Sequence, residues 1–446
     1  MMDSNAPGFR LYDVLNHQKE EIVAIGPHGT ITAARFRRDV AALAGLLPDA
    51  GFLVNLCTER YRFMVGFAAA LLRGQVSLMP AAATPAVLRD LTEAYPGLYA
   101  LADGPVPDLP HLIFPARLPE AEEEPLSIPG GQPAVVLFTS GSTGKPKPVM
   151  KSWSVLVHSA HTAGARLGVA AMRGGCIIGT VPHQHSYGLE SVITLAWQHG
   201  LAVFTEAPLF PADIRAALEA APTPRLLVTT PVHLRALTAD PDKMPALAML
   251  LCATAPLPHD LAEAAEAAFQ APLVEIYGCT EAGQIATRRS THETTWHCFE
   301  AVSLHRDEAG WWAQGAAVEG VAPVQDEIEP TSEEHFRLGN RAADLVNIAG
   351  KRSSIAYLNH QLLAVPGVRD GSFLMEEGGT QSVPRLKALA VAPGLTVAEI
   401  IQALRARLDP TFLPRPLILV ERLPRNALGK LQRADLLALA SLREAK

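Results

Sequence analysis

The chain has 446 residues, more than one compact core usually holds, so we expect at least two domains. Its hydrophobic fraction of 48% and charged fraction of 19% allow a packed interior and exclude a largely disordered chain. The 38 basic and 45 acidic residues give a net charge of −7, which disfavours nucleic acid as the main partner.

The cysteines and the N-terminal segment predict a cytoplasmic location. The five cysteines are scattered and contain no C-x-x-C pair, which disfavours a disulfide framework or a structural zinc site. The N-terminal segment lacks the apolar core of a secretory signal, and apolar stretches such as 64–72 are far shorter than the ~20 residues of a membrane-spanning helix. We therefore expect a soluble cytoplasmic protein, most plainly an enzyme.

Strand and helix patterns alternate along most of the chain. Helical periodicity begins early, and short apolar strand-like segments then alternate with further helical ones, as is typical of βαβ units around a parallel sheet. The expected helices are 33–47, 61–72, 154–169, 188–199, 211–221 and 258–270, and the expected strands are 134–140, 176–182, 201–206, 225–230, 249–254 and 273–278.

The pattern changes after about residue 285. Segment 291–334 is rich in Trp, Glu, Gly and turn residues, which predicts an antiparallel region, and a new strand, helix and strand follow at 386–391, 397–408 and 417–421. We predict an α/β protein with a large N-terminal domain of mixed and parallel sheets over residues 1–341. A small, mobile α+β domain is expected over residues 342–446.

The clearest local motif is F-T-S-G-S-T-G-K-P-K at 138–147, directly after an apolar strand. Small residues let the backbone bring its N–H groups against an anion, and hydroxyls and lysines add donors and charge. It is not a Walker A loop, which would need Gly at Thr139 and Ser or Thr at Pro146. A plain surface turn is the alternative. The motif predicts a polyphosphate site made of Thr139, Ser140, Gly141, Ser142, Thr143, Gly144 and Lys147.

This motif resembles the T-S-G-S-T-G-x-P-K signature of the adenylate-forming superfamily, which includes acyl- and aryl-CoA synthetases, nonribosomal peptide adenylation domains and luciferases. Its members join a carboxylic acid to ATP as an acyl-adenylate, release pyrophosphate and pass the acyl group to a thiol. Further matching motifs occur in the same order, and together they span residues 138–433. The resemblance implies ATP and Mg²⁺ as cofactors.

A second motif, Y-G-C-T-E at 277–281, resembles the family's Y-G-x-T-E and ends an expected strand. The resemblance places Tyr277 beside adenine, Thr280 at phosphate and Glu281 on Mg²⁺, and Gly278 is assigned to the nucleotide site with them. Ligands of parallel sheets bind outside the carboxyl ends of the strands, and a carboxylate suits Mg²⁺. Taken alone, Glu281 would be a solvated acid at a helix start.

Two further nucleotide contacts follow from the resemblance. The segment C-A-T-A-P at 252–256 corresponds to one that lines the adenine and acyl site, so Thr254 and Ala255 are assigned there; an ordinary strand-to-helix turn is the alternative. Asp326 and Arg341 have the spacing of the family's ribose-binding aspartate and ribose- and phosphate-binding arginine. The usual T-G-D around the aspartate is absent, and two solvated charges are the alternative.

Motifs near the C-terminus imply a mobile domain with a catalytic lysine. Segment 340–352 resembles the family's hinge, although Ala343 stands where an aspartate or lysine is usual. Segment P-R-N-A-L-G-K at 424–430 resembles the family's P-R-N-x-x-G-K, whose lysine reaches the α-phosphate and the carboxylate oxygen. Lys430 is therefore the candidate catalytic cation. A solvated lysine would be expected without the preceding residues.

The acid substrate is assigned to V-P-H-Q-H-S-Y-G-L at 181–189, which aligns with the family's acyl-pocket segment. His185 takes the position beside the carboxylate, with catalytic and substrate-binding roles. His183 and His185 could instead indicate zinc, but no third ligand is near in sequence. The full expected acid site is His185, Tyr187, Thr230, His233 and Gly278.

Segments 55–63 and 344–352 resemble one branch, the ligases that load aryl acids onto an acyl carrier protein in xanthomonadin and aryl polyene pathways. The implied substrate is 3- or 4-hydroxybenzoate, and the implied acceptor is the carrier's phosphopantetheine thiol. Its docking is expected to use basic residues such as Arg352, Arg405 and Arg425. The alternatives are an aryl- or acyl-CoA ligase, a non-catalytic acyl- or nucleotide-binding protein of the same fold, and a kinase or NTPase that releases ADP.

Overall fold

The chain forms two compact units in the computed structural model, one of residues 1–324 with 331–336 and the other of residues 325–330 with 337–446. No helix among the described residues is long and apolar enough to cross a bilayer. The structure describes residues 10–27, 29–80, 83–139, 147–239, 244–308, 310–339, 345–348, 351–376, 385–408, 410–426 and 431–444.

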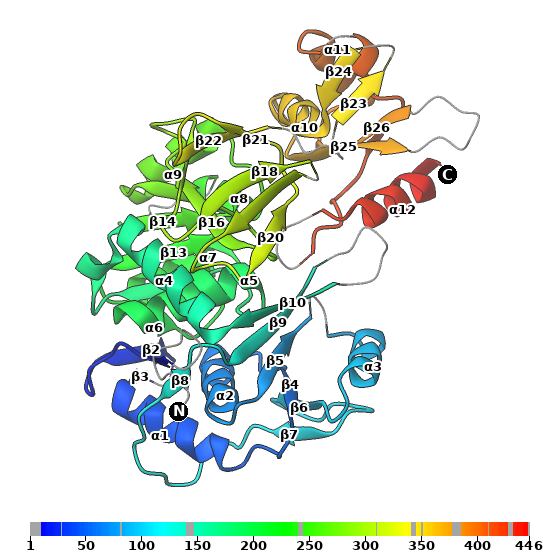
Figure 1. Ribbon diagram of the computed structural model, residues 1–446. Coiled ribbons are helices and arrows are strands. Elements are labelled where there is room, and N and C mark those ends of the chain that lie inside the picture. Colours follow the sequence, from blue (N-terminus) through cyan, green and yellow to red (C-terminus); the bar gives the residue numbers. More distant parts are fainter. Residues whose placement is uncertain are drawn as a thin grey trace. The chain divides into compact units, whose positions relative to one another are not determined.

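The smaller of the two main sheets in the first unit has the order β10-β9-β5-β4-β6-β7 (Figure 1). All its neighbours are parallel except the β9–β10 pair. The helix α3 packs on it through Leu88 and Leu91, against Val54, Leu78 and Val136 of the strands. The bounds are β4 Phe52–Asn55, β5 Val76–Met79, β6 Tyr99–Ala102, β7 His111–Ile113, β9 Pro133–Thr139, β10 Lys147–Ser152, α1 Ala33–Ala44, α2 Arg60–Leu72 and α3 Pro85–Ala94.

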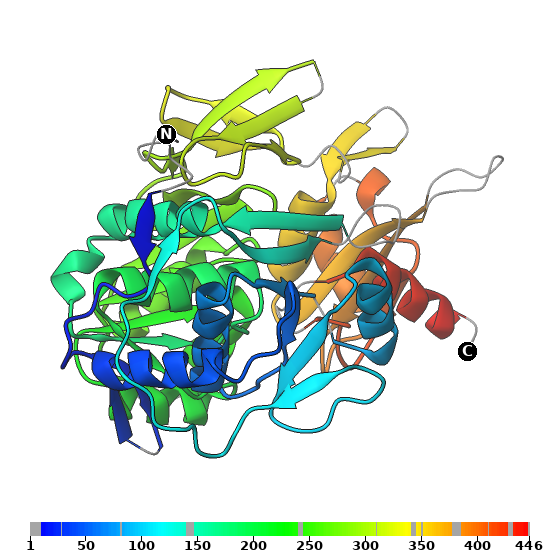
Figure 2. The same ribbon diagram turned by 60° about the horizontal axis from the view of Figure 1, so that its bottom comes forward.

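The larger sheet of the first unit runs β22-β17-β16-β15-β14-β13-β11-β12-β2-β3, and its central strands from β15 to β2 are parallel (Figures 1 and 2). One face is covered by α7, α8 and α9, whose Leu218, Leu234 and Phe269 pack against strand residues such as Leu227 and Leu250. The strands are β2 Ile22–Gly26, β3 Gly29–Thr32, β11 Cys176–Gly179, β12 Ala202–Phe204, β13 Arg225–Thr229, β14 Met249–Cys252, β15 Leu273–Cys279, β16 Gly283–Arg288, β17 Trp296–Cys298 and β22 His335–Leu338.

The remaining elements of the first unit lie around these sheets. A separate antiparallel sheet β18-β19-β20 agrees with the antiparallel region predicted for 291–334. The remaining bounds are β1 Leu11–Asp13, β8 Ser127–Pro129, α4 Trp153–Leu167, η1 Val169–Met172, α5 Ser186–Gly188, η2 Leu189–Thr194, α6 Leu195–His199, α7 Pro211–Ala220, α8 Pro231–Thr238, α9 His259–Phe269, β18 Ser303–Asp307, β19 Gly310–Gln314 and β20 Val321–Val324.

Arg60, at the start of α2, connects the first part of the chain to the larger sheet. Its guanidinium is fully buried and donates to the carbonyl oxygens of Phe204 and Glu206 at 2.7 and 2.9 Å, and to those of Gly179 and Val181 at 3.1 and 3.4 Å. Burial lowers the pKa of Arg60 to about 10. The carbonyls that receive it belong to the carboxyl-terminal ends of β11 and β12, so this cation fixes the edge of the sheet where ligands are expected.

The second unit is built on the three-stranded sheet β25-β26-β27. Alternate residues face opposite sides: Phe373 packs with α10 and α11, whereas Leu374 and Leu389 pack with Leu436 of α12. The bounds are β21 Ile328–Pro330, β23 Leu345–Ile348, β24 Lys351–Ser354, α10 Ile355–Leu363, β25 Asp370–Glu376, β26 Arg385–Val391, α11 Val397–Arg405, η4 Pro410–Phe412, β27 Leu417–Leu419 and α12 Arg433–Glu444.

The α/β fold predicted from the sequence is confirmed, with one local correction. Helix and strand ends mostly differ from the expected ones by one to three residues. The segment expected as a single helix over 188–199 begins at Ser186 and passes through six residues of π-helix, Leu189–Thr194, before α6. Such an insertion is frequent at functional sites because it redirects a side chain, and here the redirected segment carries Glu190.

Candidate active site

Three of the five predicted acid-site residues, Tyr187, Thr230 and His233, lie near the carboxyl ends of two neighbouring parallel strands. Gly179 of β11 is opposite Val228 of β13, so Thr180 and Thr230, the residues that follow these strands, come out at the same edge. The helix α8 begins at Pro231 and returns His233 to this edge one turn later. Tyr187, in α5, is directed to the same place by the turn that follows β11.

These side chains form one hydrogen-bonded group, which we call the hydroxyl–imidazole cluster: Thr180, Tyr187, Thr229, Thr230 and His233. The Nδ1 of His233 lies 2.9 Å from the Thr230 hydroxyl and 3.3 Å from the Thr180 hydroxyl, and the two hydroxyls of Thr180 and Thr229 are 3.0 Å apart. The Tyr187 hydroxyl donates to the Thr229 carbonyl oxygen at 3.3 Å. The structure thus brings Tyr187, Thr230 and His233 together as predicted.

Burial keeps this cluster uncharged near neutral pH. It lowers the pKa of His233, so the imidazole is neutral, and it raises the pKa of Tyr187 well above its ordinary value, so the phenol keeps its proton. The hydroxyls of Thr180 and Thr230 both lie within hydrogen-bond distance of His233 Nδ1. Within the described part of the chain, Nε2 of His233 has no hydrogen-bond partner, so this nitrogen can bind a ligand. The cluster therefore suits a neutral polar group such as a hydroxyl.

The two histidines of the H-x-H motif have separate environments. His183 is buried, its ring lies 4.4 Å from that of Phe63, and its Nε2 is 3.3 Å from the Cys57 carbonyl oxygen. Burial lowers the pKa of His183 to about 3. His185 is half-buried and immediately precedes α5. This core position of His183 does not favour the zinc interpretation.

A buried ion pair joins β10, the strand after the phosphate motif, to η2, and the sequence analysis missed it. Lys151 of β10 lies 3.2 Å from Glu190 of η2, and each side chain is at most 2% exposed. The hydroxyls of Ser186 and Ser159 donate to the same carboxylate at 2.6 and 2.9 Å. Burial acts to raise the pKa of Glu190, but Lys151 and the two serines outweigh it, so the pKa lies below its ordinary value.

The ion pair also lies beside Gly283, the first residue of β16, which follows the Y-G-C-T-E segment. Gly283 has φ +80°, and a Cβ at this position would be 2.7 Å from the Lys151 ammonium nitrogen and 3.2 Å from a Glu190 carboxylate oxygen. A Cβ on Gly278 would in turn be 2.2 Å from the Gly283 carbonyl oxygen. The strand after the phosphate motif, the acid-site segment and the start of β16 therefore meet around Lys151 and Glu190.

The predicted nucleotide residues occupy the next strand ends. Tyr277 is nearly buried, with its ring centroid 5.5 Å from that of Trp296 and 5.8 Å from that of Phe336, so two aromatic rings fix its orientation. Thr280 and Glu281 are half-buried in the turn between β15 and β16. Because β14 and β15 are parallel neighbours, this turn lies at the same edge of the sheet as the residues that follow β14.

Those residues include Thr254, whose φ is +82°. A left-handed backbone is rare for a β-branched residue and costs roughly 1–3 kcal/mol, so it persists only where the surrounding structure enforces it. Such strain is concentrated at functional sites. Thr254 and its half-buried neighbour Ala255 are therefore consistent with a ligand-lining segment.

The other predicted residues are only partly described. Lys147 is exposed at the start of β10 and pairs across the sheet with Thr139, and Asp326 is half-buried in the second unit. Seven candidates lie outside the described residues: Ser140, Gly141, Ser142, Thr143, Gly144, Arg341 and Lys430.

The residues flanking Lys430 are firmly held within the second unit. Arg425 forms a bidentate ion pair with Asp370, at 2.6 and 2.8 Å, and pairs as a β-bridge with Leu431. The arginine of P-R-N-A-L-G-K is thus held within the second unit by Asp370 and by its pairing with Leu431. Because its charge is matched by Asp370, Arg425 is a poor candidate for carrier docking.

Comparisons with known proteins identify the family of the chain. The family model described as "AMP-binding enzyme" matches residues 85–304. The chain is 30% identical over 61% of its length to a 4-coumarate–CoA ligase of Rhodobacter capsulatus, covering 67% of that protein. It is 31% identical over 66% of its length to a 4-coumarate–CoA ligase of Halorhodospira halophila, covering 74% of that protein.

A solved structure shares the fold over nearly the whole chain. It is the o-succinylbenzoate CoA synthetase of Bacillus subtilis in complex with its acyl-adenylate intermediate, with a TM-score of 0.81 and 19% identity. The match covers 96% of this chain and 98% of that one, so the fold of the C-terminal region is included.

Proposed function

Since this chain belongs to the AMP-binding enzyme family of adenylate-forming acid ligases, we propose that it activates a hydroxybenzoate with ATP and then transfers it to a thiol. The carboxylate displaces pyrophosphate from ATP to give an aryl-adenylate, and the acceptor thiol displaces AMP to give a thioester. The preferred acceptor is the phosphopantetheine of an acyl carrier protein.

The neutral hydroxyl–imidazole cluster is the observation that carries the choice of acid. A ring hydroxyl can donate to or accept from His233 Nε2 without leaving a buried charge. A site that hydrogen-bonds a substrate hydroxyl discriminates strongly against analogues that lack it. A substrate ammonium would need an acidic partner, and the cluster contains none. The two 4-coumarate–CoA ligase relatives are named for a phenolic acid, which supports the same class.

Glu281 and the phosphate motif fit a metal–nucleotide substrate. Glu281 is a half-buried carboxylate one residue after Thr280, and oxygen ligands of this kind suit Mg²⁺, which when bound offsets the charge of the phosphates. We propose that Tyr277 and Gly278 contact the adenine, that Thr254 and Ala255 line the site, and that Lys430 approaches the reacting carboxylate and α-phosphate. Asp326 and Arg341 are proposed to hold the ribose.

Pyrophosphate exchange tests the proposed acid and the reaction type together. We expect 3- and 4-hydroxybenzoate to support ATP–pyrophosphate exchange at least about 10-fold faster, in kcat/KM, than benzoate, a fatty acid or an amino acid. ADP as the product, or an aliphatic acid as the best substrate, would contradict the proposal. Lys430→Ala should reduce exchange by about 100-fold or more while hydroxybenzoate binding is kept.

The second candidate function is an aryl-CoA ligase, which the names of the curated relatives favour. The two differ only in the acceptor, so rates with CoA and with holo-carrier protein distinguish them. If a carrier is used, Arg405→Glu on the exposed end of α11 should slow transfer to the carrier and leave exchange unchanged. Arg38→Glu, an exposed arginine of α1, is the control.

A further inference from the structure

An alternating pattern separates two groups of side chains on β17 and β22. Trp296 is opposite Phe336 and His297 is opposite His335 in this antiparallel pair. Successive residues of a strand point to opposite faces. Trp296 and Phe336 are buried against Tyr277, so the two histidines lie on the other face. None of the functions assigned above uses them.

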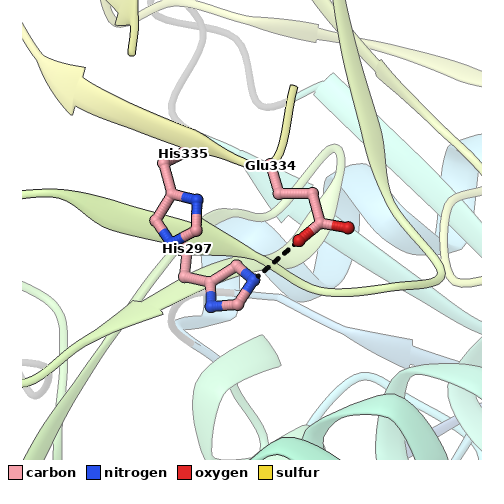
Figure 3. A group of neighbouring side chains, drawn as sticks. All are labelled: His297, Glu334 and His335. Carbon is pink, nitrogen blue, oxygen red and sulfur yellow. Dashed lines mark hydrogen bonds and ion pairs between the residues drawn. The ribbon is translucent and has the colours of Figure 1, made fainter. Parts of the chain in front are cut away.

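Glu334 completes a group of three possible metal ligands on that outer face (Figure 3). The Nε2 of His297 is 3.2 Å from a Glu334 carboxylate oxygen, and the two imidazole rings are stacked with centroids 4.2 Å apart. One ligand atom from each residue lies within 4.8 Å of the others. Tetrahedral zinc has ligand atoms about 3.3 Å apart, so His297 and Glu334 already have the required separation, and the stacked ring of His335 must turn to direct a nitrogen at the same ion.

The backbone and a neighbouring hydroxyl hold these ligands in place. The Cys298 amide donates to the Glu334 carbonyl oxygen at 2.8 Å, and the amides of Thr331 and Ser332 donate to the His335 carbonyl oxygen at 2.8 and 3.1 Å. The Ser332 hydroxyl lies 3.2 Å from His335 Nδ1. A ligand histidine is commonly oriented by a hydrogen bond at its other nitrogen, which leaves Nε2 of His335 for the metal.

The positive charge of Arg166 near these three side chains affects which metal ions they can bind. Arg166 donates to the carbonyl oxygens of His297 and Cys298 at 3.3 and 2.9 Å, so a guanidinium stands close to the group. A site with one carboxylate beside an arginine offers little general attraction for cations. Binding must then come from imidazole nitrogens, which favour zinc and similar transition metals over Mg²⁺ or Ca²⁺.

We propose that His297, Glu334 and His335 form a zinc site, with water in the fourth position. The ion would join β17 to β22 on the face opposite the rings that hold Tyr277. It is separate from the Mg²⁺ assigned to Glu281, so the proposal does not depend on the function proposed above.

Zinc titration of the full-length, chelator-treated protein tests the site, with a chromophoric chelator as competitor. We expect one equivalent to bind with a Kd below about 10 μM, and His297→Gln and His335→Gln to weaken it by about 10-fold or more. The exposed His292→Gln is the control and should bind like the wild type. Binding that survives both ligand substitutions, or no binding up to 100 μM zinc (roughly ten times the expected Kd), would overturn the proposal.

Two further measurements keep the test decisive if a variant folds poorly. Crystals of the wild-type protein soaked in zinc should give an anomalous peak among the three side chains; a peak only at a cysteine such as Cys279 would count against the site. Cys279→Ser should leave zinc affinity unchanged. Magnesium at millimolar concentration should not displace the ion, whereas displacement would contradict the assignment to imidazole ligands.

Discussion

His233 is the residue on which the proposed substrate preference depends. His233→Asn can keep a polar atom near Nδ1, where Thr180 and Thr230 bind, but removes Nε2. We expect the ratio of kcat/KM for 4-hydroxybenzoate over benzoate, measured by pyrophosphate exchange, to fall about 10-fold, because one buried hydrogen bond is lost. A purely structural effect would lower kcat/KM for 4-hydroxybenzoate and for benzoate equally, and that result would contradict the assignment. His233→Gln, which can place an amide near the Nε2 position, should recover part of the ratio.

Removing one partner of the Lys151–Glu190 pair should destabilise the first unit strongly, whereas replacing both partners by uncharged residues should destabilise it much less. Lys151→Met leaves a carboxylate buried without its cation, so we expect the first unit to lose about 3–5 kcal/mol in urea unfolding. The double variant Lys151→Met, Glu190→Gln should recover much of this loss, since the amide can still bond to Ser186 and Ser159.

The exposed Lys19–Glu123 pair provides the comparison for this experiment. Lys19 is 65% exposed, so Lys19→Met should change the unfolding free energy by less than about 1 kcal/mol. Equal losses of unfolding free energy for Lys19→Met and Lys151→Met would show that the contribution of the Lys151–Glu190 pair to stability does not depend on its burial.

At the level of elements, the turn from β15 to β16 depends on two glycines. A Cβ on Gly278 would lie 2.2 Å from a backbone carbonyl oxygen, which cannot move aside as a flexible side chain could. Gly278→Ala should therefore destabilise the first unit by about 1–3 kcal/mol and lower the kcat of pyrophosphate exchange, since the turn carries Thr280 and Glu281. Gly51→Ala, where a Cβ meets nothing within 4 Å, is the control. A thermal midpoint unchanged in Gly278→Ala would contradict the predicted clash.

The elements also show what the sequence could and could not predict. Periodicity and short apolar runs predicted the parallel strands, and the carboxyl end of one of them predicted where Tyr277 would lie; Thr230 and His233 were assigned to the acid site for their hydrogen-bonding groups. Thr180 and Thr229 were missed because a threonine at a strand end has no distinguishing pattern; their contact depends on the register between β11 and β13. The Lys151–Glu190 pair was missed because it joins residues 39 positions apart through a π-helical turn. The available hint was the acidic Glu190 inside an otherwise mainly apolar helical segment.

For the molecule as a whole, buried neutral histidines should make stability fall on the acid side. Burial lowers the pKa of His17 to about 4 and that of His183 to about 3. The unfolded chain binds these protons near pH 6.5, so stability is complete above that pH and is lost as the pH falls toward the folded-state values. Each histidine should cost on the order of 2 kcal/mol between pH 7 and pH 5.

Urea unfolding at pH 7, 6 and 5 checks this expectation. His17→Gln can keep the hydrogen bond to the Leu201 carbonyl oxygen but cannot take up a proton. Between pH 7 and pH 5, the unfolding free energy of this variant should fall by on the order of 2 kcal/mol less than that of the wild type, because one titrating histidine is gone. A wild-type stability that is constant from pH 7 to pH 5 would contradict the assignment of these histidines as neutral.

The guanidinium of Arg60 has a consequence for the order in which a nascent chain can mature. Its four acceptors belong to residues 179–206, which leave the ribosome after it. At roughly 5–20 residues per second, Glu206 is synthesised about 7–30 s later than Arg60. Until then α2 carries an unmatched cation that water must solvate. The four hydrogen bonds that fix the start of α2 to the larger sheet can therefore form only after the middle of the polypeptide has been synthesised.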